Sequence, residues 1–254
     1  MAANLLTGFV EETGKISSFV GKSIFWAFRP PFFWGEVFRS AKNIAFECLL
    51  PVIAVVGPTG MVVTLQSIAV FKIFGAERLL SSLLAESMFS ELSPMLASIM
   101  VAAQAGSAVA GELGTMRVKE EIDAMEVMSI NPFQYVIIPR LLALAFICPI
   151  LNIIACLCGI IGGFLVAVVL KGLNYGVFMD NLLSFLKLHH IWGGMLKASI
   201  FGLVVGIMSC YRGYNVSGGA LGVGKAANNT VVHSILIIVI VNYFVTSALI
   251  NLTN

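Results

Sequence analysis

Charged side chains are scarce in this chain of 254 residues: Asp, Glu, Lys and Arg make up 11% of it, and hydrophobic residues make up 59%. Soluble domains carry about 25% charged residues. With a mean hydropathy of +0.97, the composition excludes an ordinary soluble domain and indicates a protein with several membrane spans. The net charge is only +2 and no basic tract occurs, so nucleic acid is not an expected partner.

The sequence also lacks the patterns of a disulfide framework and of a metal site. Its five cysteines lie in or beside apolar segments, where free cysteine packs as a small hydrophobic residue. Cys156 and Cys158 stand close together, but no further ligand residues flank them, so packing is favoured over metal binding. We predict no metal and no cofactor on this chain.

Five apolar segments reach the roughly 20 residues that a helix needs to cross a bilayer. The first contains Pro51 and the pair Gly57-Pro58, which predict a kink or a break. The second extends backwards toward Leu79. The segments cover 43–71, 92–111, 141–170, 190–211 and 226–254. We therefore predict an all-α integral membrane protein with five transmembrane helices.

The residues before the first span have the pattern of a helix that lies in the membrane interface. Ile16, Phe19 and Ile24 share one helical face, and Lys22 lies off it. The whole chain is expected to form one domain. Its parts are the interfacial N-terminal region 1–42 and the five-span core 43–254 of the single domain 1–254.

Lysine and arginine are divided unevenly between the two sides that five spans create. Cytoplasmic segments carry an excess of these residues. A cytoplasmic N-terminus places ten of them inside and five outside, which favours that orientation and puts the C-terminus outside. The inside set is Lys15, Lys22, Arg29, Arg39, Lys42, Arg117, Lys119, Arg140, Arg212 and Lys225, and the outside set is Lys72, Arg78, Lys171, Lys187 and Lys197.

Residues 112–130, between the second and third spans, are too charged to lie in hydrocarbon. Val118, Ile122 and Met125 recur at i, i+4 and i+7, which predicts a short amphipathic helix. This helix either forms a hairpin without a partner or docks into a groove on a soluble subunit. Two oppositely charged pairs at i, i+4 spacing support it: Arg117 with Glu121, and Lys119 with Asp123.

Glycine-rich patterns occur in the second half of the chain. Residues 219–226 resemble a phosphate-binding loop, but Ala226 replaces the Ser or Thr that binds Mg and a membrane span precedes the loop. We expect a tight turn there, and any ATP to be hydrolysed by another chain. Two glycine pairs are spaced for close helix packing, within one subunit or at a dimer interface: Gly159 with Gly163, and Gly202 with Gly206.

A set of short motifs, in their order and spacing, resembles the MlaE/YrbE permease family of MCE-type lipid transporters. The resemblance extends over nearly all of the chain from about residue 40. The motifs are Glu91-Leu-Ser-Pro94, Ala105-Gly-Ser-Ala108, Gly111-Glu-Leu-Gly-Thr-Met116, Glu120-Glu-Ile-Asp-Ala-Met-Glu-Val-Met128, Asn131-Pro132, Pro139-Arg140, Tyr211-Arg-Gly-Tyr214 and Thr230-Val-Val-His-Ser234.

The resemblance implies the permease subunit of an ABC transporter that moves phospholipid or a related lipid between membranes, working as a dimer in the bacterial inner membrane. In that family the polar helix between spans two and three is a cytoplasmic coupling helix. It contacts a separate ATPase subunit, which binds ATP and Mg, and an MCE-domain protein is a further partner. Carried over by motif, the ATPase contact falls to Glu112, Gly114, Met116, Arg117, Glu120, Glu121 and Glu126.

The family also has a lipid pocket between two permease subunits, near the outer half of span one and the start of span two. This chain departs from the family where Ser90 and Gln104 stand in place of arginines and Ser93 replaces a glycine. Two basic groups are therefore missing, which argues against charge pairing with a headgroup and points to a different lipid. The matching pocket positions are Val63, Val70, Phe71, Phe74 and Glu91.

Two other functions remain open on the sequence. An ion-coupled secondary transporter would need ionisable pairs within its spans and inverted repeats, and the sequence indicates neither. An intramembrane lipid-modifying enzyme would use Ser107 or the pair His189-His190, although no nucleophile-elbow motif is present. Glu91 either lines a polar cavity or marks the solvated end of a span.

Overall fold

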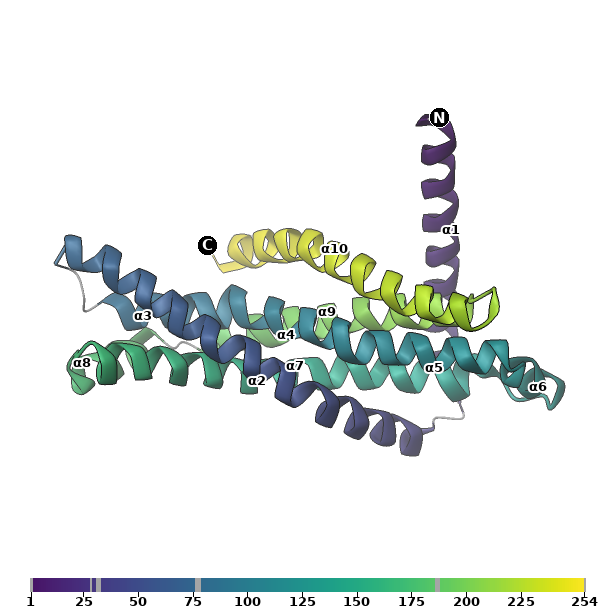
Figure 1. The fold of residues 1–254 in the computed structure, drawn as a ribbon, viewed down its shortest axis with the longest axis horizontal. Coiled ribbons are helices and arrows are strands. Elements are labelled where there is room, and N and C mark those ends of the chain that lie inside the picture. The colour runs from purple at the N-terminus through teal and green to yellow at the C-terminus, as the bar shows by residue number, and fades with distance from the viewer. Residues whose placement is uncertain (1, 28, 31–32, 76–78, 186–187, 254) are drawn as a thin grey trace.

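The computed structural model describes residues 2–27, 29–30, 33–75, 79–185 and 188–253. Within these ranges the chain forms helices and no strand. Most of the helices lie along the long axis of the molecule, and α1 (Ala2–Ala27) stands crosswise near one end (Figure 1). The predicted all-α fold with an N-terminal helix is confirmed.

The predicted five membrane-spanning segments are also confirmed. Each is a helical stretch of the described chain that is long and apolar enough to cross a membrane. The first is the single helix α2, and the last belongs to α10 (Gly219–Thr253). The segments are Trp34–Ile73, Leu80–Val118, Phe133–Leu170, His190–Tyr214 and Gly219–Leu249.

The second and third spans are assembled from several helical pieces with wider π-helical turns between them. Such turns occur frequently at functional sites. Span four lies within one helix, α9 (Leu188–Tyr214). Span two joins α3 (Leu80–Ser87), η2 (Met88–Leu92), α4 (Ser93–Val101), η3 (Ala102–Gly106) and α5 (Ser107–Val118), and span three joins η4 (Phe133–Ile137), α7 (Ile138–Phe164) and η5 (Leu165–Leu170).

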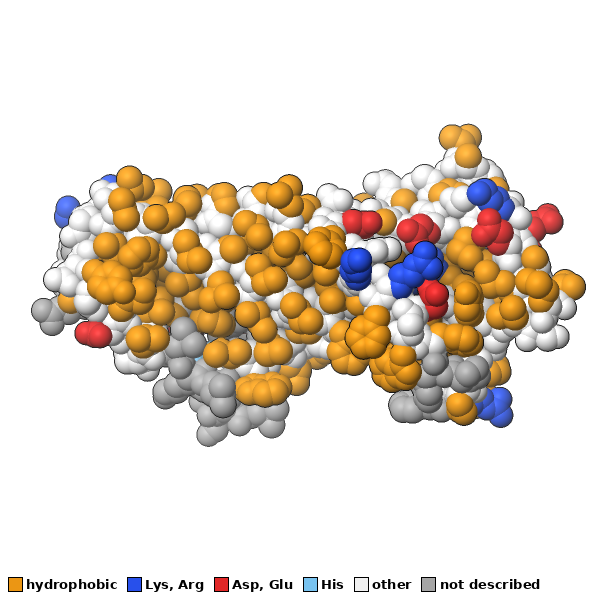
Figure 2. Space-filling view, turned by 90° about the horizontal axis from the view of Figure 1, so that it is seen from below, with side chains coloured by type: hydrophobic (Ala, Val, Ile, Leu, Met, Phe, Trp, Pro, Cys, Tyr) orange, Lys and Arg blue, Asp and Glu red, His pale blue; other side chains and the backbone are white. Residues whose placement is uncertain are grey.

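Short helices lie at the two ends of the bundle. α6 (Glu121–Val127) follows span two at one end, and α8 (Tyr175–Phe185) follows span three at the opposite end (Figure 1). We call these the α6 end and the α8 end. On the face shown in Figure 2, hydrophobic side chains cover most of the surface, and most acidic and basic side chains gather toward the α6 end. This distribution suits a bundle that spans a membrane.

Glycines let the helices of the bundle approach closely. A Cβ built at Gly60 of α2 would lie 2.0 Å from the carbonyl oxygen of Gly159 on α7. A Cβ at Gly202 of α9 would lie 2.5 Å from the carbonyl oxygen of Leu144, also on α7. The glycine pairs seen in the sequence therefore contact neighbouring helices of the same chain, as small residues do in membrane bundles.

The first span does not contain the break that its prolines predict. Helix α2 (Trp34–Ile73) continues through Pro51 and Pro58, although neither proline has an N–H for the carbonyl four residues before it. Close packing on α7 supports the helix, and spans tolerate proline where a neighbouring helix does so. The helix also begins within 1–42, the region expected to lie in the interface.

The connection between spans four and five differs from the expected turn over 219–226. The turn is made by Gly218 and Gly219, whose φ angles are 91° and 66°, and α10 already begins at Gly219. Glycine takes positive φ at little steric cost, so one pair of glycines is enough to form the turn.

Helix α8, which was not expected from the sequence, is only 11 residues long. It is too short to give the hydropathy signal of a span.

Candidate functional site

Polar side chains from spans two, four and five meet inside the bundle toward the α8 end. The ammonium of Lys197 on α9 lies 2.7 Å from Oε1 of Glu91 in η2. Lys197 also donates to Oγ1 of Thr246 on α10 at 2.8 Å, and Asn242 Nδ2 donates to Oε2 of Glu91 at 3.0 Å. We call these four residues the Glu91 network.

The local sequence explains why a lysine is held at this point. Pro94 has no N–H to offer the carbonyl of Ser90, four residues before it in the helix. Lys197 donates to that carbonyl oxygen instead, at 2.7 Å. Its side chain is only 3% exposed, so the charge is stabilised by Glu91 and by the backbone of the π-helical turn rather than by water.

A second buried contact ties the same turn to span three. Ser93 Oγ lies 2.7 Å from Oδ1 of Asn152 and 3.0 Å from the backbone oxygen of that residue on α7. Both residues are buried. The serine that replaces the family's glycine thus forms a hydrogen bond between spans that glycine could not form.

A cavity of about 700 Å³ adjoins the Glu91 network, a volume within the usual range for small-molecule sites. Its described walls combine four large apolar side chains with seven polar or charged ones. Glu91 exposes 39% of its side chain. The described residues that line the cavity are Leu83, Glu86, Ser87, Ser90, Glu91, His190, Trp192, Gly193, Gly194, Leu196, Lys197, Thr246 and Leu249.

Of the five positions to which the resemblance assigns lipid contact, the structure places Glu91 in this cavity. Of the other four, three lie on α2 and Phe74 directly follows it, and none is among the described residues that line the cavity. Val63 and Phe71 pack against the buried cluster that contains Val52 and Leu84. Val70 and Phe74 are exposed on the surface of the chain, at 53% and 75%.

Two expectations about charge in the spans are wrong. The sequence indicates no ionisable pair within the spans, but Glu91 and Lys197 form one. Lys197 also belongs to the interior rather than to an outer segment. The pair was missed because its members are 106 residues apart. The available signal was a lysine and a glutamate in separate apolar runs, since each is costly in a membrane without a partner.

The α6 end carries the charged segment between spans two and three. Glu120 takes a left-handed conformation with a φ of 60°, so the helix is broken there and α6 begins at Glu121. Ile122 is buried and anchors α6 to the bundle. The charged pairs differ from those predicted from i, i+4 spacing: Arg117 pairs with Asp123, and Lys119 lies 4.0 Å from Glu121.

The residues that the resemblance assigns to the ATPase contact have different surroundings. Glu120, Glu121 and Glu126 are exposed, and Met116 and Arg117 are half-buried. Glu112 pairs with Arg140 at 2.9 Å. Gly114 is buried, and a Cβ there would lie 3.0 Å from Val216. Beside the exposed acids, Val127 and Met128 are 87% and 62% exposed.

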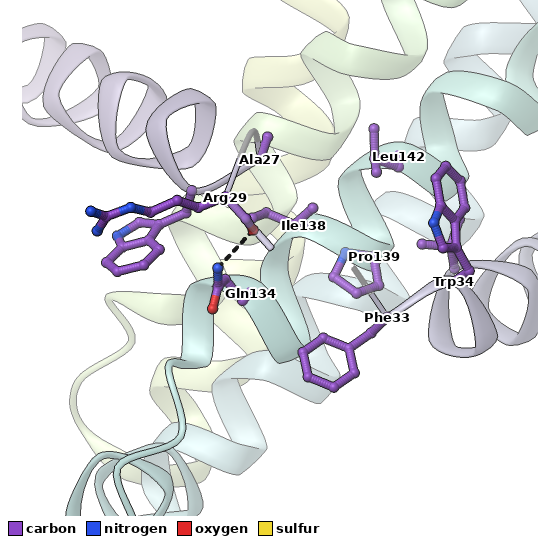
Figure 3. Close-up of a pocket in the computed structure, with 10 residues that line it drawn as sticks. Ala27, Arg29, Phe33, Trp34, Gln134, Ile138, Pro139 and Leu142 are labelled. Atoms are coloured by element: carbon purple, nitrogen blue, oxygen red, sulfur yellow. Dashed lines mark hydrogen bonds between the residues drawn. The ribbon is translucent and has the colours of Figure 1, made fainter. Parts of the chain in front are cut away.

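Helix α1 and the start of α2 are attached to this same end. Phe19 packs among Phe133, Tyr211 and Tyr214, and Glu12 pairs with Arg212 at 2.7 Å. Figure 3 shows the connection between α1 and α2, where Gln134 Nε2 donates to the backbone oxygen of Arg29 at 2.9 Å. Phe33, Trp34, Pro139 and Leu142 line the small pocket beside it.

The side chains of Ser107 and His190, two of the three candidate catalytic residues, belong to the described part of the chain, and that of His189 lies outside it. Ser107 Oγ bonds to backbone oxygens of its own helix, at 2.6 Å to Ala103 and 3.0 Å to Gln104. His190 Nδ1 lies 3.5 Å from Ser90 Oγ, beyond the 2.6–3.2 Å or so of an activated nucleophile. No group of three His, Cys, Asp or Glu side chains in the described chain could hold a metal.

A helical bundle with five candidate spans, a cavity toward one end and a charged inter-span helix at the other defines a multi-span membrane protein of the permease class. The chain belongs to the MlaE permease family, because a profile of that family, described as Permease MlaE, matches residues 37–248.

Individual relatives agree with this assignment. The chain is 34% identical over 238 residues to a probable ABC transporter permease protein of Rickettsia felis, which covers 94% of this chain and 92% of the relative. It is 35% identical over 191 residues to the intermembrane phospholipid transport system permease protein MlaE of Haemophilus influenzae. This match covers 74% of this chain and 72% of the relative. Protein TRIGALACTOSYLDIACYLGLYCEROL 1, chloroplastic, of Arabidopsis thaliana is 34% identical over 188 residues. This match covers 74% of this chain and 54% of the relative.

Proposed function

We propose that this chain is the membrane-spanning subunit of an ABC transporter that moves phospholipid or a related lipid between membranes. The cavity beside the Glu91 network carries the proposal, because a lining that combines large apolar side chains with polar and charged ones suits an amphipathic ligand. The names of the relatives support it: the one from Rickettsia felis is called a probable ABC transporter permease, and the one from Haemophilus influenzae a phospholipid transport permease.

The lipid path would extend from this cavity to the surface of α2. Val70 of α2 and Phe74 directly after that helix expose apolar side chains there, and Val63 and Phe71 of α2 pack against the buried core. A second permease copy, identical or paralogous, would cover this surface and hold acyl chains against it. An MCE-domain protein would receive or supply the lipid at the α8 end.

The energy would come from a separate ATPase subunit that binds ATP and Mg. The stretch 219–226, which resembles a phosphate-binding loop in sequence, lies within α10. The exposed acids of α6 surround an exposed apolar tip, Val127 and Met128. A short amphipathic helix of this kind suits a groove on a partner.

The α6 end would lie in the cytoplasm of a bacterium, and the chain in its inner membrane. Because Lys197 is buried, the outer segments keep four Lys or Arg residues against ten inside, which strengthens the charge bias for this orientation. The C-terminus would then lie outside, and α1 would lie along the inner surface, crosswise to the spans (Figure 1).

Span two would link the two ends mechanically. It runs as one helical segment from Leu80 to Val118, with Glu91 at the cavity and α6 directly after its other end. Its two π-helical turns are points where a helix can change its winding. Closure of the ATPase subunits would push α6, and span two would transmit the movement to the cavity.

Co-purification tests this proposal most simply. The chain is isolated in mild detergent with its bound neighbours, and proteins and lipids are identified by mass spectrometry. We expect an ATPase subunit and phospholipid. A Gly193→Leu variant should retain less lipid, because only Leu249 lies within 4 Å of a Cβ there and the side chain would fill the cavity. Absence of both ATPase and lipid would contradict the proposal.

An ion-coupled secondary transporter is the second candidate, favoured by one observation, the ion pair between Glu91 and Lys197 within the spans. The two candidates differ in their energy source. If lipid movement stops when ATP is withheld and does not change when an ion gradient is imposed, the chain works by the ABC mechanism. If the ion gradient alone drives lipid movement, the chain is an ion-coupled secondary transporter.

A further inference from the structure

We propose that the cavity selects a lipid whose headgroup carries a primary ammonium group, as in phosphatidylethanolamine, over an anionic lipid such as phosphatidylglycerol. This inference rests on the proposed function and names its substrate class. It follows from which hydrogen-bonding groups of the Glu91 network are already used and which remain for a ligand.

The cation of the network is not available to a phosphate. An ammonium group has three N–H donors, and Lys197 directs all three at protein oxygens. These are the backbone oxygen of Ser90 at 2.7 Å, Glu91 Oε1 at 2.7 Å and Thr246 Oγ1 at 2.8 Å. With 3% of its side chain exposed, Lys197 cannot turn toward a headgroup without losing these bonds.

The unused capacity of the network consists of acceptors. A carboxylate offers about four acceptor positions. Oε1 of Glu91 accepts from Lys197 and from Thr246, whereas Oε2 accepts only from Asn242, and the side chain remains 39% exposed. An ammonium headgroup would donate to this oxygen and match its negative charge, whereas a headgroup with a net negative charge would be repelled by it.

The charge of the cavity wall points the same way. Among the described residues that line it, Glu86 and Glu91 are acidic and Lys197 is basic. Glu86 is exposed and pairs with no cation in the described part of the chain. The wall is therefore net negative, which repels an anionic headgroup and attracts an ammonium.

The apolar part of the cavity does not discriminate between these lipids. Leu83, Trp192, Leu196 and Leu249 line it, and they would contact acyl chains of either lipid alike. Selection then depends on the headgroup alone, and two lipids with identical acyl chains isolate it.

The experiment is a binding competition on the full chain in detergent with the subunits it retains. Equal amounts of dioleoyl phosphatidylethanolamine and dioleoyl phosphatidylglycerol are added, and the ratio of bound lipids is measured by native mass spectrometry. We expect about tenfold enrichment of phosphatidylethanolamine, since a charge-assisted hydrogen bond contributes enough for a factor of that order.

Two variants and a control sharpen the test. Glu86→Gln, at an exposed position where folding is not at risk, should reduce the enrichment about threefold. Glu91→Gln should abolish or invert it, because Lys197 loses its counter-charge. Asp180→Asn removes the same charge from exposed α8, outside the cavity, and should leave the ratio unchanged.

The results separate this inference from the proposed function. If Gly193→Leu lowers the total bound lipid but the unmodified chain binds both lipids equally, or prefers phosphatidylglycerol, the headgroup inference is wrong and the lipid cavity stands. An enrichment that neither Glu86→Gln nor Glu91→Gln changes also overturns the inference. If Gly193→Leu leaves the total bound lipid unchanged, the cavity itself is not the lipid site.

Discussion

Lys197 and Glu91 form an ion pair of 2.7 Å between the fourth and second membrane spans, with the lysine side chain 3% exposed and the glutamate 39%. A charge without a partner inside a membrane span is costly. In the ion pair each of the two charged side chains has a partner of opposite charge. It also joins three spans, because Asn242 and Thr246 of α10 bond to it.

Removing the lysine alone should destabilise the bundle. Lys197→Met leaves Glu91 without its counter-charge. Loss of one partner of a buried pair costs about 3–5 kcal/mol, and the partial exposure of Glu91 reduces this to about 1–3 kcal/mol through screening. The measurement is thermal unfolding of the purified chain in detergent.

The double variant supplies the control for that prediction. Lys197→Met combined with Glu91→Gln removes both charges and should recover most of the lost stability, since the coupled pair is non-additive. Additive losses in the double variant would show that the two residues do not interact in the folded chain.

The contact between α2 and α7 makes a prediction about packing. Gly60→Ala would place a Cβ 2.0 Å from the carbonyl oxygen of Gly159, which forces the helices apart at a cost of about 1–3 kcal/mol or more. Gly57→Ala is the matched control on the same helix, because no heavy atom lies within 4 Å of its Cβ. We expect a lower melting temperature for the first variant and an equal or higher one for the second.

Much of the fold was predictable from the sequence because the membrane reduces the problem to length and apolarity. The segment 141–170, for example, has no charge and appears as span three, Phe133–Leu170. The ends of the spans were less predictable: α2 begins at Trp34, within the region 1–42 that was expected to lie in the interface. The break that was one of the two outcomes expected at Pro51 and Pro58 does not occur, because packing on α7 outweighs the lost hydrogen bonds.

The site was only partly predictable. Glu91 stood out as a carboxylate beside an apolar run, but its partner could not be chosen from the sequence, since Lys197 is 106 residues away and reaches it only through packing of α9 on span two. The charged segment at the α6 end was evident from composition. Its turn at Glu120 was not, because a non-glycine residue with positive φ is uncommon and has no sequence signal.

The exposed tip of α6 should matter for assembly and not for stability. Val127 is 87% exposed, so Val127→Ser should leave the melting temperature of the isolated chain unchanged. If the tip docks into the ATPase, the variant should weaken the complex about tenfold, as loss of an apolar anchor does. Affinity of the purified subunits measures this.

Ile73→Ser is the matched control for the docking prediction. Ile73 is 80% exposed and ends α2, away from the α6 end, so its replacement should not affect the ATPase. Equal affinities of the two variants would place the ATPase contact elsewhere.

The orientation of the chain predicts opposite labelling of two positions. In cells, a membrane-impermeant thiol reagent should modify Asp180→Cys on α8, and should reach Met128→Cys only after the membrane is opened. Cys158→Ala serves as the background, because the other four native cysteines are buried. Labelling of Met128→Cys in intact cells would reverse the assigned topology.

The central claim is that an ATPase subunit bound to α6 drives lipid through the cavity. The most direct measurement is ATP-dependent lipid transfer by the reconstituted complex carrying Glu120→Lys and Glu121→Lys, with Asp180→Lys as the control. We expect ATP hydrolysis to continue while lipid transfer falls at least about tenfold, a loss of roughly 1.4 kcal/mol of coupling, and the control to transfer lipid normally. Normal lipid transfer and intact assembly in the double variant would contradict the account.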